Sequence, residues 1–307
     1  MTEPTSPSTT LQARTPEDVL AAVPVVLGFE PQQSLVMLTF GGTESFHARV
    51  DLPPPAEVDA GVAQLLEPAV LHRATRVLFV VYADDGRASR LAMRRLRQAF
   101  GEAGIEVVEV IRVHDGRWFA PGRPGAAPTG VPFDVGNHHF RAQAVAEGIV
   151  VHRSRAELEE LLQPRPEAVD EVARAVRRAV PSPPGELGDL VDLRLDAGRF
   201  STPELARVLL GLQEGEGRDA ALAAMSRDAA LEHVRLWTDA VQRAPAELAD
   251  APAAVLALAA WLAGHGALAW CAVDRSRATG PGLTLASLVA DLLTRAVPPS
   301  AWSQAAS

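Results

Sequence analysis

The polar and aromatic residues best suited to chemistry lie in the first half of the chain, in two short segments that each follow an apolar run. An Asp-Asp-Gly turn follows the first run, and His-Asp-Gly-Arg-Trp follows the second. A carboxylate pair can bind a divalent cation or transfer a proton, and a histidine can shuttle one. An arginine can clamp an anion, and a tryptophan can stack on a ring. The candidate ligand-binding residues are therefore Asp84, Asp85, His114, Asp115, Arg117 and Trp118.

Each candidate also has a purely structural interpretation. Asp-Asp-Gly is a common turn, and Asp85 could cap a following helix. Asp115-Gly116 is typical of a two-residue β-hairpin, and Trp118 could cover the edge of a core. The sequence contains neither a phosphate-binding Gly-rich loop nor a His-Glu-x-x-His motif. Catalytic residues and cofactors are therefore left unassigned.

The histidine pair at His138-His139 suggests a metal site, but its spacing argues against one. Adjacent helical residues point about 100° apart, so the two rings cannot easily share one ion. Asp134 has helical spacing to His138, yet no third ligand is evident. Cys271 is the only cysteine, which excludes a thiolate site within one chain. We predict no metal.

These candidates require a sheet to position them. Apolar runs predict strands at 34–40, 45–52, 76–82 and 105–113, and the segments between them predict helices at 56–71 and 87–101. A further helix is expected at 137–147, after a Gly- and Pro-rich loop at 121–135 that should hold no regular element. This order predicts an α/β domain with a mixed sheet, in which ligands bind at the carboxyl ends of strands.

The second half predicts only helices. Amphipathic segments from 154 onward suggest an all-α domain of helical hairpins, loosely similar to tetratricopeptide repeats. The segment 181–188 is expected to be a linker. We predict an N-terminal tail at 1–13 that is disordered, an α/β domain at 14–163 and a helical domain at 189–302, with the boundary between 150 and 188.

Bulk properties restrict the partners. The net charge is −9, so the chain has no overall positive field to attract nucleic acid. The run Arg90, Arg94, Arg95 and Arg97 is typical of a solvated helix face, with a polyanion site as the alternative. The apolar stretch 251–273 is interrupted by Pro and Gly, which favours two buried helices over a membrane span. No signal-peptide pattern and only one cysteine favour the cytoplasm.

The most distinctive segment is LGFEPQQSLV, which includes Leu27, Gly28, Phe29, Pro31 and Ser34. Capping and packing account for it as a helix end followed by a strand, and no Gly-x-Ser-x-Gly elbow supports Ser34 as a nucleophile. The segment resembles the opening of the DUF4192 family of uncharacterised actinobacterial proteins. The resemblance implies an actinobacterial source and no particular activity. Relatives carry Cys-Cys-Pro where this chain has Ala126-Ala127-Pro128, so the resemblance implies no thiol chemistry here.

Two classes of function remain. We favour an interaction or regulatory protein that uses the C-terminal helices as a platform for another protein, because no catalytic set is complete. The alternative is a small-molecule binder or enzyme with its site in the loops of the α/β domain. An exposed apolar groove around Trp261 and Trp270 would favour the platform, and convergence of Asp84, His114 and Arg117 in one pocket would favour the binder.

Overall fold

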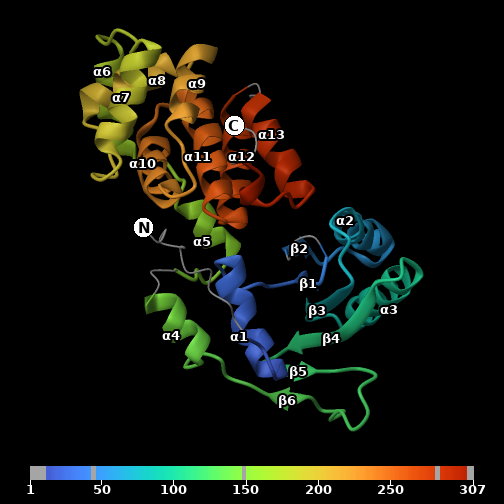
Figure 1. Ribbon diagram of the computed structural model, residues 1–307. Coiled ribbons are helices and arrows are strands. Elements are labelled where there is room, and N and C mark those ends of the chain that lie inside the picture. The colour runs from blue at the N-terminus through green and yellow to red at the C-terminus, as the bar shows by residue number, and fades with distance from the viewer. Residues whose placement is uncertain (1–11, 43–45, 147–149, 281–283, 303–307) are drawn as a thin grey trace, which may run out of the picture. The chain divides into compact units, whose positions relative to one another are not determined.

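The computed structural model describes residues 12–42, 46–146, 150–280 and 284–302 (Figure 1). The chain forms two compact units, residues 1–153 and 154–307. The first is an α/β unit with a mixed sheet and the second is helical, which confirms the predicted fold class. The predicted disorder of residues 1–13 falls mostly outside the described residues.

The first unit is built around one six-stranded sheet in the order β2-β1-β3-β4-β5-β6 (Figure 1). Only β3 and β4 are parallel neighbours, and the other adjacent strands run antiparallel. The strands span Ser34–Phe40 (β1), His47–Asp51 (β2), Arg76–Tyr82 (β3), Glu106–His114 (β4), Arg117–Phe119 (β5) and Val131–Pro132 (β6).

Helices cover both faces of this sheet. The first core contains Val19, Leu20 and Val23 of α1, which pack on one face against apolar residues of β1, β3 and β4. The second core lies on the opposite face, where α2 and α3 cover the alternate residues of the same strands. Because both faces are covered, β1 and β3 are nearly continuous apolar runs. The helices span Pro16–Leu27 (α1), Val58–Leu71 (α2), Gly86–Glu102 (α3) and His139–Ala146 (α4).

The ends of α1 follow local signals in the sequence. Thr15 and Asp18 form a reciprocal capping box at the first turn. Gly28 ends the helix with φ 79°, a left-handed conformation that favours glycine, and its N–H donates to the Pro24 carbonyl. The predicted end of this helix in the LGFEPQQSLV segment is confirmed.

The loop at 121–135 differs from expectation in one respect. Its last part forms the short strand β6, in which Val131 lies opposite Trp118 of β5. β6 is the edge strand of the sheet, where Pro132 is tolerated because no further strand needs its missing N–H. The prediction that 121–135 holds no regular element is therefore wrong at this edge.

The second unit contains the helices from α5 onward. Two predictions are corrected here. The supposed linker 181–188 contains the start of α7, because Pro184 occupies the first turn, where its missing N–H costs nothing. The amphipathic pattern at 218–243 predicts one long helix, but the structure divides this region into α9 and α10. The helices span Arg155–Glu160 (α5), Pro166–Val176 (α6), Pro184–Arg194 (α7), Thr202–Gly211 (α8), Gly215–Ala223 (α9), Ala230–Arg243 (α10), Asp250–Leu262 (α11), Gly266–Thr279 (α12) and Thr284–Thr294 (α13).

The core of the helical unit centres on α11. Twelve of its thirteen residues are Ala, Leu, Val, Trp or Pro, and every residue from Ala251 to Leu262 is buried. This helix accounts for most of the apolar stretch 251–273, with α12 accounting for the rest. Among the described residues, no helix is both long and apolar enough to cross a membrane.

Candidate functional site

The carboxyl ends of β3 and β4 bring two of the predicted residues together. His114 Nδ1, at the end of β4, lies 3.4 Å from Asp84 Oδ1, just after β3. Asp84 also accepts a hydrogen bond of 2.5 Å from Gln33 Nε2, which precedes β1 at the same sheet edge. Asp85 has a different role, because its side chain caps α3 by accepting from the Arg87 N–H at 2.6 Å.

Arg112 joins this edge and is not among the residues predicted from the sequence. Its Nη2 lies 3.4 Å from the Ala83 carbonyl, and its guanidinium stacks 5.4 Å from the Phe119 ring centroid. Arg112 Nε is buried without a hydrogen-bond partner among the described residues. The pKa of Arg112 is lowered, mainly by burial and to a smaller extent by the nearby positive charge of Arg90. The carboxylates of Asp84 and Asp85 partly oppose this effect. The available signal in the sequence was the position of Arg112 inside a predicted strand, two residues before His114.

The remaining candidates point elsewhere. Arg117 donates to the carbonyls of Thr129 and Gly130 at 2.8 and 3.0 Å, so it fastens the loop rather than facing Asp84. Trp118 packs in the core beneath α1 and donates to Glu17 at 2.8 Å. Asp115 (φ 48°) and Gly116 (φ 63°) are both left-handed, as a type I′ hairpin turn requires.

The LGFEPQQSLV segment has structural roles throughout. Leu27 and Gly28 end α1, Phe29 is 3% exposed, and Pro31 is buried. His152 pairs with this segment through backbone hydrogen bonds to Gly28 and Glu30. The fully buried Ser34 donates to the Gln32 carbonyl at 2.6 Å and accepts from Arg49 Nε at 2.8 Å. Its hydroxyl is therefore committed to packing the start of β1.

The histidine pair has a structural explanation. His138 Nε2 lies 3.0 Å from Asp18 of α1, and each of these side chains is 16% exposed. Asp134 instead accepts from the Gly136 N–H at 2.8 Å, so it does not join His138. Across the described ranges, no three His, Cys, Asp or Glu side chains are grouped as metal ligands.

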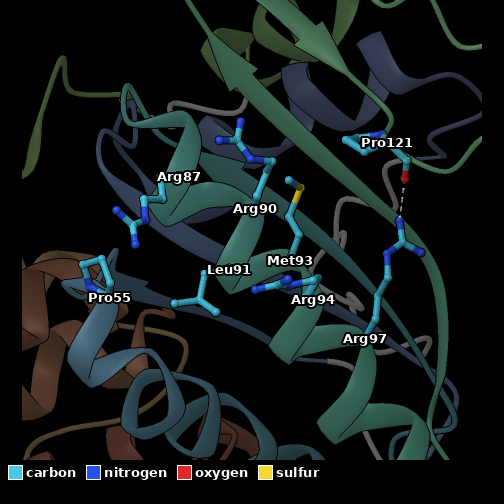
Figure 2. A pocket seen from close by; sticks show the side chains of 8 residues that line it. All are labelled: Pro55, Arg87, Arg90, Leu91, Met93, Arg94, Arg97 and Pro121. Atoms are coloured by element: carbon cyan, nitrogen blue, oxygen red, sulfur yellow. Dashed lines mark hydrogen bonds between the residues drawn. The ribbon is translucent and has the colours of Figure 1, made fainter.

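A groove of about 530 Å³ lies along α3 (Figure 2). Arginines project from successive turns of the helix, and Pro55 and Pro121 lie on opposite sides of them in this view. We call this feature the arginine groove. Its described lining residues are Pro55, Arg87, Arg90, Leu91, Met93, Arg94, Arg97 and Pro121.

The arginines of the groove differ in their partners. Arg97 Nη2 donates to the Pro121 carbonyl at 3.0 Å (Figure 2). Arg95 belongs to the same run in the sequence, but it does not line the groove and pairs with Asp59 of α2 at 3.1 Å. The guanidinium groups of Arg87, Arg90 and Arg94 make no hydrogen bond or ion pair within the described part of the chain, and all three residues are exposed.

The spacing of these residues explains the arrangement. Positions 87, 90, 94 and 97 recur at intervals of three and four, so they share one face of a helix. The same interval pattern in the sequence would have included Arg87 and separated Arg95. In the sequence, Arg90, Arg94, Arg95 and Arg97 stand together as a run and Arg87 stands apart, so only the helical spacing shows which of them share a face.

This site can bind anions. Arginine presents a planar fork of donors that matches carboxylates and phosphates. Each exposed pair contributes little, because water and salt screen it, so recognition requires several pairs at once. The Asp84–His114 pair could exchange a proton, but the Asp84 side chain is 81% exposed. Such exposure does not supply the dry, preorganised setting of most catalytic carboxylates.

Comparisons with known proteins identify a family and no characterised relative. No curated protein and no solved structure matches this chain. The family model described as a domain of unknown function (DUF4192) matches residues 16–300, which is nearly the whole chain. The protein therefore belongs to the DUF4192 family.

Proposed function

We propose that this protein is an interaction module that binds an anionic partner in the arginine groove. One observation carries the proposal: Arg87, Arg90 and Arg94 line a groove, yet no acidic side chain of the described chain pairs with their guanidinium groups. The chain has 38 acidic residues against 29 basic ones, so acids are abundant. Guanidinium groups left together without a carboxylate are suited to one, or to a phosphate, from another molecule.

The helical platform predicted around the tryptophans has less support. Trp261 is 4% exposed, and its indole donates to the Val297 carbonyl at 3.0 Å. Its ring lies 6.3 Å from Trp302 in an edge-on arrangement. Trp261 therefore fills the core of its own unit and offers little surface to a partner. For this reason we place the docking surface of the proposed module on α3.

A second candidate is a small-molecule binder or enzyme at the carboxyl ends of β3 and β4. The approach of His114 to Asp84, with Arg112 beside them, favours it. Thermal-shift screening against nucleotides, sugar phosphates, amino acids and divalent cations tests this candidate. A ligand at 100 times its dissociation constant stabilises by about 2.7 kcal/mol, and Asp84→Asn should abolish that gain. If the ligand raises the melting temperature of Asp84→Asn as much as that of the wild type, the ligand does not bind at this edge of the sheet.

The proposed setting is the cytoplasm of an actinobacterium, with neither nucleic acid nor membrane as partner. Cys271 is a buried free cysteine, which suits a reducing compartment. All 29 basic residues are arginine, and an arginine-rich chain without lysine suits a GC-rich genome. The net charge of −9 disfavours a long polyanion as partner.

Affinity capture from a lysate of the source organism tests the proposal. The wild type is compared with Arg90→Gln/Arg94→Gln and with Arg174→Gln/Arg178→Gln, which removes two exposed arginines of the same spacing from the region of α6. We expect molecules that the wild type and the α6 variant recover and the groove variant loses. Identical recovery by all three proteins would refute a role for the groove.

A further inference from the structure

We infer that the partner segment in the arginine groove is an acidic stretch of another protein that also carries a large apolar side chain. The inference rests on the proposed function, because it specifies the chemistry of the anionic partner. Three observations support it: the length of the arginine stripe, which is the row Arg87, Arg90, Arg94 and Arg97 along one face of α3; the apolar floor of the groove; and the acidic residues Asp84 and Asp85 at one end.

The length of the stripe favours a chain over a small anion. Ten residues of helix separate Arg87 from Arg97, which corresponds to about 15 Å along the axis. An extended peptide covers that distance with about four or five residues. A single phosphate or carboxylate would contact only one end, whereas a peptide with several carboxylates can pair with Arg87, Arg90 and Arg94 together.

The floor of the groove is apolar. Leu91 is half-buried between the arginines, and Met93 lines the groove while belonging to the core on that face of the sheet. Pro55 and Pro121 add apolar surface at the sides (Figure 2). Methionine adapts its shape to irregular partners. Only an apolar side chain of the partner can bury this apolar surface and so add to the binding free energy. A purely polar anion would leave this surface unused.

The surroundings disfavour nucleic acid. None of the described lining residues is aromatic, so the groove offers no ring on which a base could stack. A long phosphate backbone passing Arg87 would also meet Asp84 and Asp85, which lie beside the N-terminus of α3. A short acidic segment avoids this repulsion by ending before the two carboxylates.

Fluorescence anisotropy of the full-length protein tests the inference with four labelled probes. The first is a short peptide of glutamates and leucines, and the second replaces each leucine by serine. The third replaces each glutamate by glutamine, and the fourth is single-stranded DNA of the same charge. We expect only the first peptide to bind well, with an affinity that falls as salt is raised.

The matched variants locate the binding. Arg90→Gln/Arg94→Gln should weaken the first peptide about tenfold, since two modest charge pairs are lost. Arg174→Gln/Arg178→Gln should leave its affinity within about twofold. Both variants should keep the wild-type melting temperature, because these arginines are exposed and make no pair within the described chain. The charge-reversed variant, Arg90→Glu/Arg94→Glu, should bind a peptide of lysines and leucines that the wild type does not bind.

The outcomes separate the two proposals. One outcome is that DNA or phosphatidylglycerol vesicles bind, that this binding requires Arg90 and Arg94, and that the first peptide does not bind. That outcome overturns the acidic-peptide inference, while the groove remains an anion site. Peptide binding that is equal in the groove variant and the wild type also overturns it. If none of these probes depends on Arg90 and Arg94 and lysate capture is equally unaffected, the proposed function fails as well.

Discussion

The indole nitrogen of Trp118 donates a hydrogen bond of 2.8 Å to the carboxylate of Glu17, which joins β5 to the first turn of α1 across 101 residues of sequence. The ring itself packs into the core between α1 and the sheet. Trp118, which the sequence suggested could stack on a ligand, therefore helps to hold α1 against the sheet.

Replacing Trp118 by Phe keeps most of the apolar contact and removes this hydrogen bond. We expect the free energy of unfolding to fall by about 1 kcal/mol, which is typical for one such bond. Urea unfolding of the wild type, Trp118→Phe, Glu17→Gln and the double variant measures the coupling. If the double variant loses the sum of both single effects, the two residues are not coupled as described.

The carboxylate of Asp18 makes stability depend on pH. Hydrogen bonds from the backbone N–H groups of Arg14 and Thr15, together with His138, lower its pKa from 3.8, although burial partly opposes them. A lowered pKa in the folded state means that the carboxylate stabilises the protein above the unfolded pKa. That contribution is lost as pH falls below about 3.8 and through the lower folded pKa.

We therefore expect the urea midpoint of the wild type to fall more steeply than that of Asp18→Asn as the pH is lowered from neutrality to about 3. Asp196→Asn serves as a control, because Asp196 is exposed and makes no hydrogen bond or ion pair within the described residues. Parallel pH curves for the wild type and Asp18→Asn would contradict the assignment.

The single thiol should be inert in the folded protein. Cys271 is 3% exposed, and burial, offset in part by Arg155, raises the pKa of its thiol to about 11. A thiolate is the reactive form, so both access and ionisation are low. A colorimetric disulfide reagent should react slowly with native protein at mildly alkaline pH and at once in denaturant. Rapid reaction of the native protein would show that this part of α12 opens readily.

The helical unit depends on one buried arginine. Arg243 is 3% exposed and donates to the Phe200 carbonyl at 2.8 Å, to Asp239 at 2.7 Å and to Thr202 Oγ1 at 3.1 Å. Arg243→Met should cost about 3 kcal/mol of unfolding free energy, because it leaves Asp239 poorly paired in a mostly buried position.

A second substitution distinguishes charge from packing in this case. Asp239→Leu combined with Arg243→Met removes both charges and should recover much of the lost stability. Arg174→Gln, on the exposed surface of α6, should change stability by less than about 0.5 kcal/mol. If the double variant is no more stable than Arg243→Met, the loss comes from packing and not from an unpaired carboxylate.

Local interactions were sufficient to predict much of the α/β unit. The helix end at Gly28 and the Asp115-Gly116 turn each depend on residues within a few positions of one another. The apolar run 76–82 predicts a strand covered on both faces for the same reason. Local signals mislead where one residue type suits two structures. The Pro-rich segment 181–188 predicts a linker, but Pro184 occupies the first turn of α7.

The sequence by itself determined the fold class, the family and most element boundaries, because caps, turns and apolar periodicity act over short distances. The tertiary structure decided which polar residues meet. Asp84 joins His114 across parallel strands, while Arg117 is taken up by loop carbonyls and Trp118 by Glu17. Such pairings depend on the packing of distant segments. The same packing leaves the guanidinium groups of Arg87, Arg90 and Arg94 together beside a groove, with no acidic partner among the residues that the structure describes.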